Sequence, residues 1–255
     1  MKRVPACLLL SVLVLAAVPT ASAQITEWPT TVAPGRFLLE MDAVSLTVDR
    51  EPGFKYTAVG AASPFLTTGL THNWDIQVGA KLFISQKVEL GGRSDRSSGI
   101  GEVYVRTKYR FYEDSETGTA VAFLPYVKIP TNTGNVGNDA VEGGVIVPWT
   151  TTLTGGFAVA AMAGIDVYRN DNDDGYDLNL QGSASLTRKI TGALGVYGEV
   201  ALAKSSGASS AEGIMGGGVT LSVSENTWWD FAIYKGISSA AADWNQVIRF
   251  NFGFY

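Results

Sequence analysis

Large apolar residues alternate with polar ones along most of the chain. In the last nine residues, VIRFNFGFY, the apolar positions are Ile248, Phe250, Phe252 and Phe254. Arg249 and Asn251 occupy the other parity. Because a strand turns successive side chains to opposite faces, this segment has one apolar face and one polar face. The alternation predicts a β-strand that ends the chain.

Segments with the same alternation recur from residue 36 onward. We predict twelve strands, at residues 36–48, 54–67, 74–84, 100–112, 118–130, 139–148, 155–168, 176–187, 192–204, 212–223, 228–237 and 245–255. Most are about twice as long as the 5–6 residues typical of globular strands, and they match the roughly 10-residue strands of transmembrane barrels. No segment shows the 3.6-residue period of an amphipathic helix. The chain is therefore predicted to be all-β.

The connections between these segments alternate in length. Residues 113–118, 188–191 and 224–227 form short turns, whereas residues 85–99 and 204–213 form long loops. Short turns at one end and long loops at the other are typical of outer-membrane barrels. The pattern predicts a transmembrane antiparallel β-barrel of twelve strands. Both termini are predicted to be periplasmic, because the number of strands is even.

The apolar faces are predicted to point outward, toward lipid. Trp74, Trp149, Trp228 and Trp229 adjoin short turns, and Tyr168, Tyr176 and Trp244 lie near the opposite strand ends. Two such aromatic belts are expected where a membrane meets water. The alternative is a secreted soluble all-β protein, in which the apolar faces would pack inside.

The amino terminus has the layout of a secretory signal peptide. Lys2 and Arg3 precede an apolar run, and cleavage is expected after Ala23. Cys7 is the only cysteine and lies in this segment, so the mature chain would have no disulfide and no thiolate chemistry. We divide the chain into a signal peptide at residues 1–23, an irregular lead-in at residues 24–35 and a barrel at residues 36–255. The lead-in could enter the lumen or hang in the periplasm.

Charge and composition disfavour some classes of function. The formal net charge is −5, and nucleic-acid-binding proteins usually present basic surfaces, so no nucleic-acid partner is predicted. The glycines at residues 99–101 and 216–218 lack the lysine and the following helix of a phosphate loop, and no cofactor is predicted. The predicted location is the bacterial outer membrane, whose lipids are predicted partners.

Several short motifs resemble those of a known family. They are Gly69-Leu70-Thr71 between two strands, Gly99 to Gly101 followed by Glu102, Lys108-Tyr109-Arg110-Phe111, and Lys128 to Thr131. They resemble the meta-pathway of phenol degradation family of outer-membrane β-barrel proteins, and the resemblance covers most of the mature chain. It implies a porin-like barrel that passes small solutes, often aromatic or hydrophobic.

The last strand also resembles the carboxy-terminal signature of bacterial outer-membrane proteins, which implies that the barrel-assembly machinery is a partner. That signature ends on an aromatic residue in the lipid-facing phase. Here Phe254 has the lipid-facing phase and the terminal Tyr255 does not, so the register differs by one residue.

The polar parity of the strands supplies the candidate functional residues. The residues predicted to line a pore are Glu102, Tyr104, Arg106, Lys108, Arg110, Tyr126, Lys128, Glu142, Asp166, Glu199, Asp230 and Arg249. Arg106, Lys108, Arg110 and Lys128 lie on two adjacent strands and the acidic members mainly on later strands, so walls of unlike charge would face each other. Charged linings set the selectivity of pores. The predicted function is passive transport of a small-molecule solute.

Two alternatives to a channel remain open. Charged pairs could fill the lumen, because eight-stranded barrels are filled by side chains and sixteen-stranded barrels hold water. The protein would then be a closed structural or adhesive barrel that acts through its loops. A barrel enzyme is the other alternative. We predict no enzyme, since His72, the only histidine, lies in a short turn.

The sequence has two further local features, a cluster of aspartates and a change of phase in the first predicted strand. The clustered carboxylates Asp171, Asp173, Asp174 and Asp177 are weak candidates for calcium binding, but their spacing is not that of an EF-hand. In the first strand, the apolar parity changes between Met41 and Val44. This change predicts a β-bulge near residues 42–43.

Overall fold

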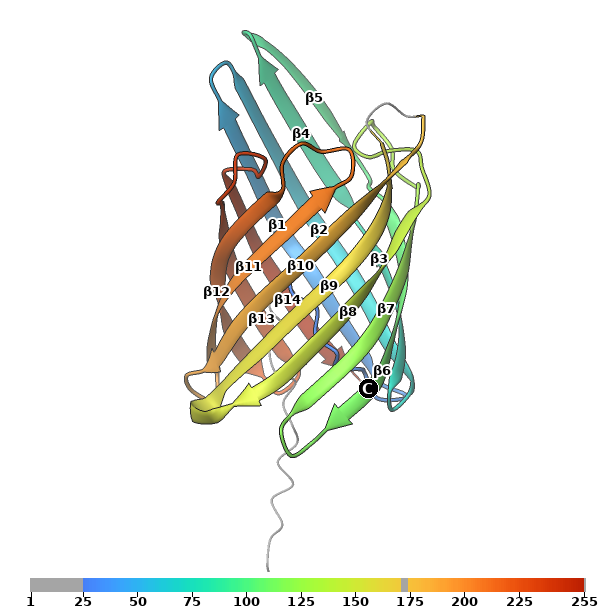
Figure 1. Cartoon of the computed structure of the whole chain (residues 1–255), viewed down its shortest axis with the longest axis vertical. Coiled ribbons are helices and arrows are strands. Elements are labelled where there is room, and N and C mark those ends of the chain that lie inside the picture. Colours follow the sequence, from blue (N-terminus) through green and yellow to red (C-terminus); the bar gives the residue numbers. More distant parts are fainter. Residues whose placement is uncertain (1–24, 171–173, 255) are drawn as a thin grey trace, which may run out of the picture.

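The computed structural model describes residues 25–170 and 174–254, which form an antiparallel β-barrel (Figure 1). The strands of its wall are β1 (Phe37–Glu51), β2 (Phe54–Thr71), β3 (Trp74–Ala80), β6 (Val103–Asp114), β7 (Thr119–Ile129), β8 (Glu142–Leu153), β9 (Phe157–Arg169), β10 (Tyr176–Lys189), β11 (Leu194–Ser205), β12 (Glu212–Ser224), β13 (Thr227–Gly236) and β14 (Trp244–Phe254). Each pairs with its neighbours in chain order, and β1 pairs with both β2 and β14 to close the wall. The predicted closed barrel of twelve strands is confirmed for the described residues.

The last strand closes the barrel against the first, as the alternation at the end of the chain predicts. Phe254 pairs with Phe37, and their rings stack with centroids 5.3 Å apart. Phe250 pairs with Met41 and packs on Trp229 with ring centroids 5.0 Å apart. The aromatic parity of β14 therefore forms a continuous apolar strip on the outer surface.

Outer side chains are apolar and exposed, and inner ones are polar and buried. Val78, Val105 and Val127 lie side by side on β3, β6 and β7 and are 37–50% exposed. Asp166 and Asp230, on the inner face, are at most 1% exposed. A soluble barrel would show the opposite arrangement, so this wall is built for lipid outside. The predicted outward orientation of the apolar faces is confirmed.

The β-bulge predicted in β1 is also confirmed. Asp42 pairs with Arg249, and Val44 pairs with Ile248. Ala43 lies between them without a paired residue in β14. The extra residue moves the alternation by one position, so apolar side chains on both sides of it face outward.

The long loop predicted at residues 85–99 is wrong, because this segment is a β-hairpin. β4 (Phe83–Leu90) continues along β2 beyond β3, and β5 (Arg93–Gly99) pairs with β4. The hairpin projects beyond the rim at the top of Figure 1. β5 has the sequence RSDRSSG, so no face of it is apolar, and most of its residues are exposed. The other strands are identified by apolar residues at every second position, which face lipid. A strand outside the membrane has no lipid-facing side and therefore lacks this pattern.

The wall bends where this hairpin begins. Ala62 in β2 has a φ of +51°, and Lys81 and Leu82 separate β3 from β4. The Lys81 N–H donates to the Glu102 carbonyl at 3.3 Å, and the Gly101 N–H donates to the Lys81 carbonyl at 2.8 Å. Backbone hydrogen bonds therefore continue through the bend and hold Lys81 beside Glu102.

Two aromatic residues predicted in the membrane belts point inward instead. Trp228 is buried, and the Tyr168 hydroxyl lies 3.3 Å from Asp166 Oδ2. Trp74, Tyr176 and Trp244 do lie on the outer face, where they are 41–49% exposed. Nearness to a strand end decides the level of an aromatic residue, but its parity decides its face.

The strand predicted at residues 139–148 ends later than expected, and some predictions concern residues that the structure does not describe. β8 runs to Leu153, so its turn consists of the 3-10 turn η1 (Thr154–Gly156). The signal peptide, its cleavage site and Tyr255 lie outside the described residues. The described residues contain no helix that is long and apolar enough to cross a membrane.

Candidate functional site

The lumen contains a cavity of about 1260 Å³. It extends from Gly118 and Asn226, in short turns at one end of the barrel, to Thr47 and Gln86 in the other half. Charged groups of both signs and several aromatic rings line it. This extended, mostly pre-formed space inside a closed wall is the candidate functional site.

The lead-in at residues 25–35 lies inside the lumen and forms part of the cavity lining; we call it the plug segment. The Thr26 N–H donates to Glu199 Oε1 at 2.6 Å. Farther along, the Val32 N–H donates to Asp75 Oδ2 at 3.2 Å. These two anchors tie the segment to opposite parts of the wall. The structure thus decides between the two locations that the sequence left open.

The sequence of the plug segment explains why it is not another strand. Pro29 and Pro34 lack an N–H and cannot continue a strand ladder. Only an isolated bridge forms, between Pro34 and Gly69. A Cβ atom on Gly69 would lie 2.2 Å from the Val32 carbonyl oxygen, so glycine at this position allows the segment to approach β2.

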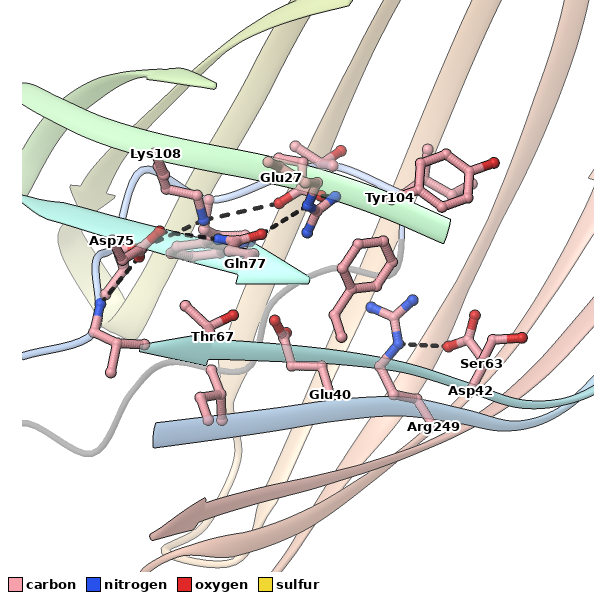
Figure 2. Close-up of a pocket in the computed structure, with 18 of the residues that line it drawn as sticks. Glu27, Glu40, Asp42, Ser63, Thr67, Asp75, Gln77, Tyr104, Lys108 and Arg249 are labelled. Atoms are coloured by element: carbon pink, nitrogen blue, oxygen red, sulfur yellow. Dashed lines mark hydrogen bonds and ion pairs between the residues drawn. The ribbon is translucent and has the colours of Figure 1, made fainter. Parts of the chain in front are cut away.

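Glu27 of the plug segment meets two cations of β6. Arg106 Nη1 lies 2.8 Å from Glu27 Oε1, and Lys108 Nζ lies 3.8 Å from Glu27 Oε2. Arg106 Nε donates to Gln77 Oε1 at 2.7 Å, which holds the guanidinium in place (Figure 2). Burial works to raise the pKa of Glu27, but the charges of Arg106 and Lys108 outweigh it and lower that pKa from its usual 4.5. Glu27 is therefore ionised at neutral pH.

Aromatic rings lie next to this ion pair. The guanidinium carbon of Arg106 is 4.0 Å from the ring centroid of Phe65. The Phe65 and Tyr104 centroids are 6.0 Å apart, and those of Tyr104 and Tyr126 are 6.5 Å apart. Lys81 Nζ lies 5.5 Å from the Tyr104 centroid. One side of the cavity therefore combines three rings with two cations, an arrangement that cation–π attraction stabilises.

The neighbouring stretch of wall, on β1 and β14, carries a second ion pair. Arg249 Nε lies 2.6 Å from Asp42 Oδ1, and Figure 2 shows Glu40 and Thr67 in the same region. Thr67 is only 1% exposed, and its hydroxyl has no hydrogen-bond partner among residues 25–170 and 174–254. Buried hydroxyls are usually paired, so this one is a site where a bound solute could donate or accept.

The remainder of the lumen is filled by side-chain networks. Asp166 is the centre of one of them and is completely buried. It accepts hydrogen bonds from the Tyr126 hydroxyl at 2.7 Å, Gln181 Nε2 at 2.7 Å and Asn179 Nδ2 at 3.1 Å. Several donors to one carboxylate compensate for its removal from water.

A second network lies near the end of the barrel that carries the loop between β7 and β8. Lys128 Nζ lies 2.7 Å from Glu142 Oε2 and 3.5 Å from Glu102 Oε1, and it donates to Asn138 Oδ1. Lys81 Nζ approaches Glu102 Oε2 to 3.7 Å. Two cations thus offset two buried carboxylates, and Asn138 ties the loop between β7 and β8 to them.

The last two networks involve Glu199 and Asp230. Glu199 accepts a hydrogen bond from the Tyr234 hydroxyl at 2.7 Å in addition to that from the plug segment. Asp230 accepts from the Thr220 hydroxyl at 2.6 Å and from Asn251 Nδ2 at 3.1 Å. Asp230 is therefore hydrogen-bonded within the wall, and Glu199 is hydrogen-bonded by both the wall and the plug segment.

The twelve residues predicted to line a pore thus fall into two groups. Those that border the cavity are Glu102, Tyr104, Arg106, Lys108, Arg110, Tyr126 and Arg249. Those that are buried in the networks are Lys128, Glu142, Asp166, Glu199 and Asp230. The cations of β6 and β7 find acidic partners close by, so the charges do not form the two open walls of unlike sign that the sequence suggested.

Several residues of the site were not predicted from the sequence. The cavity is also bordered by Glu27, Phe65, Thr67, Asp75, Gln77 and Lys81. Glu27 is the single carboxylate of an otherwise uncharged lead-in, and this is the feature of the sequence that distinguishes it. Lys81 lies at the bend of the wall, where alternation cannot assign a face.

The calcium and histidine candidates lie outside the cavity. Asp171 and Asp173 are outside the described residues, so the weak calcium hypothesis, which also includes Asp174 and Asp177, stays a prediction. Over residues 25–170 and 174–254, no group of three or more His, Cys, Asp or Glu side chains could hold a metal ion. His72 is exposed in the turn between β2 and β3, and its carbonyl accepts from the Thr31 hydroxyl at 2.9 Å.

The sequence matches one family over nearly its whole length. The family is described as "Putative MetA-pathway of phenol degradation", and its sequence model matches residues 20–254. The resemblance stated from the short motifs is therefore confirmed. No curated protein matches the chain.

The fold is similar to that of solved bacterial barrels. An outer membrane channel from Pseudomonas putida F1 has a TM-score of 0.69 at 10% identity, over 92% of this chain and 99% of that chain. The NanC porin has a TM-score of 0.54 at 9% identity, over 84% and 98%. The translocator domain of autotransporter NalP from Neisseria meningitidis has a TM-score of 0.54 at 9% identity, over 86% and 88%. These likenesses support the outer-membrane β-barrel fold.

Proposed function

We propose that this protein, which belongs to the MetA-pathway of phenol degradation family, is a passive channel for small solutes in the bacterial outer membrane. The cavity carries the proposal. It lies inside a closed membrane barrel, begins at the short turns and reaches the opposite half of the wall. A structural barrel has no need of such a space, because inward side chains could fill it.

The lining of the cavity suits small solutes with an aromatic part. Phe65, Tyr104 and Tyr126 offer ring faces, and charged groups keep the rest of the path hydrated. The channel described for Pseudomonas putida shares this fold and supports the proposal. The plug segment narrows the path, so we infer that conduction in the resting protein is small.

The remaining assignments belong to the same proposal. Residues 1–23 are removed on export, both termini face the periplasm, and the barrel-assembly machinery inserts the chain through its last strand. The protein is not an enzyme: the lumen holds ion pairs and hydrogen-bonded carboxylates, and the exposed turn residue His72 lies away from them.

Conductance in a planar lipid bilayer tests the channel. The purified protein is expected to give discrete current steps, and a variant that lacks residues 25–33 is expected to give larger ones. Glu89→Gln, in the hairpin beyond the rim, is the control and should conduct like the wild type. If neither the wild type nor the plug-deleted variant conducts, the channel proposal fails and the closed structural or adhesive barrel replaces it.

A further inference from the structure

We propose that Arg106 and Lys108 form a binding site for the carboxylate of a small aromatic acid, and that Glu27 occupies this site when no solute is bound. The inference rests on the proposed channel function and names the class of solute that the cavity takes. Glu27 then acts as an internal substitute for the solute carboxylate.

The charges around Glu27 favour a carboxylate ligand. Gln77 holds Arg106 from one side, and the guanidinium turns another N–H group to Glu27. Besides Glu27, Lys108 contacts the Thr30 carbonyl oxygen at 3.4 Å. Glu27 is the ion-pair partner of both Arg106 and Lys108 among the described residues, so without it these two buried positive charges have no ion-pair partner there. A bound carboxylate would restore neutrality through charge-assisted hydrogen bonds.

The rings beside Arg106 favour an aromatic substituent on that carboxylate. Phe65 lies 4.0 Å from the guanidinium and 6.0 Å from the Tyr104 ring. A planar acid bound to Arg106 would bring its ring against these faces, where offset or tilted ring pairs are favourable. An aliphatic acid of the same charge would forgo these contacts.

An unpaired hydroxyl gives independent support for a ligand. Thr67 lines the same cavity, is 1% exposed and has no hydrogen-bond partner among the described residues. Figure 2 shows it between Gln77, its paired residue on β3, and Glu40 of β1. A polar substituent of the solute, such as a ring hydroxyl, would satisfy it.

Competition between solute and Glu27 links binding to the plug segment. Glu27 is tethered on both sides, through the anchors at Thr26 and Val32, so its carboxylate is present at a high effective concentration. A solute must displace it, and the plug segment then loses its ion pairs with β6. Removing the Glu27 charge should therefore raise the affinity for solute while both anchors remain.

The experiment measures the binding of benzoate to the purified full-length barrel in detergent by isothermal titration calorimetry. Glu27→Gln is expected to bind benzoate about tenfold more tightly than the wild type, because the internal competitor is gone. Adding Arg106→Gln to that variant should abolish binding. Glu89→Gln, a Glu-to-Gln change in the hairpin beyond the rim, should bind benzoate like the wild type. The heat-dependent change in electrophoretic mobility of each variant verifies that it is folded.

Three further ligands distinguish the contribution of the carboxylate to binding from that of the aromatic ring. Acetate carries the charge without the ring, phenol carries the ring without the carboxylate, and benzylamine reverses the charge. We expect Glu27→Gln to bind benzoate more tightly than any of them. Equal binding of phenol and benzoate would overturn the carboxylate site, and equal binding of acetate and benzoate would overturn the aromatic part.

Failure of the proposed carboxylate site can be distinguished from failure of the proposed channel function. If the wild type conducts but no folded variant binds benzoate, the carboxylate site is wrong and the channel stands. If benzoate binds as expected but no form conducts, the channel is wrong and the barrel is a binding protein for aromatic acids.

Discussion

Replacing Val44 by arginine is expected to lower the free energy of unfolding by about 2–4 kcal/mol, because the charge would face lipid near the middle of the membrane. Val44 is 47% exposed on the outer face and pairs with Ile248. Ile248 is four residues from Trp244, which lies on the lipid-facing side at the start of β14, at the level of an aromatic belt. That separation is about 14 Å along the strand at roughly 3.4 Å per residue, or about 10 Å of depth at a tilt of 35–45°. The apolar band of such barrels is about 25 Å tall, so Val44 lies near its centre.

Ser45 is the matched control for Val44, because it is the next residue of the same strand and lines the cavity. Ser45→Arg would extend into the lumen and is expected to cost less than about 1 kcal/mol. Asp230 and Asn251 also face the lumen, but they cannot serve as controls, because both are buried and they are hydrogen-bonded to each other. Urea-induced unfolding from lipid vesicles, followed by tryptophan fluorescence, measures both variants. Equal losses for Val44→Arg and Ser45→Arg would refute the assignment of outer and inner faces.

Three further predictions concern the plug segment and the topology. Changing Arg106 and Lys108 together to Glu should repel Glu27, raise the conductance and move the reversal potential toward cations; a conducting variant with unaltered selectivity would remove these residues from the ion path. Because the pKa of Glu27 is lowered from 4.5, its ionised form stabilises the plug above that pH, and this contribution is lost as the pH falls through the lowered pKa. Conductance should therefore rise below about pH 4.5 in the wild type and not in Glu27→Gln, and a flat wild-type profile would contradict the role of Glu27. A protease site inserted at Ser209 should be cut on intact cells and one at Asn226 should not, whereas the reverse pattern would invert the barrel in the membrane.

Alternation along the chain was sufficient to predict the wall of the barrel. Each strand places every second residue on the same face, so Ile248, Phe250 and Phe252 had to share a side. The phase change in β1 was equally local, because one extra residue at Ala43 shifts the pattern and leaves a visible trace in the sequence.

Alternation failed where the environment is the same on both faces. β5 stands beyond the membrane, so neither of its faces needs apolar residues, and its sequence resembles that of a loop. Trp228 and Tyr168 were misplaced for a related reason. Nearness to a strand end sets their level in the membrane, but their parity turns both side chains into the lumen.

The contents of the lumen could not be obtained from any local pattern. The plug segment reaches Glu199 across 173 positions of sequence, and nothing in a proline-containing lead-in specifies that contact. Lys108 and Lys128 have the same inward parity, yet one borders a cavity and the other is enclosed by Glu102 and Glu142. Parity decides only whether a side chain points inward. Whether it then meets space or a partner depends on which distant strands and which segment of chain share its level, and the closed barrel sets that arrangement.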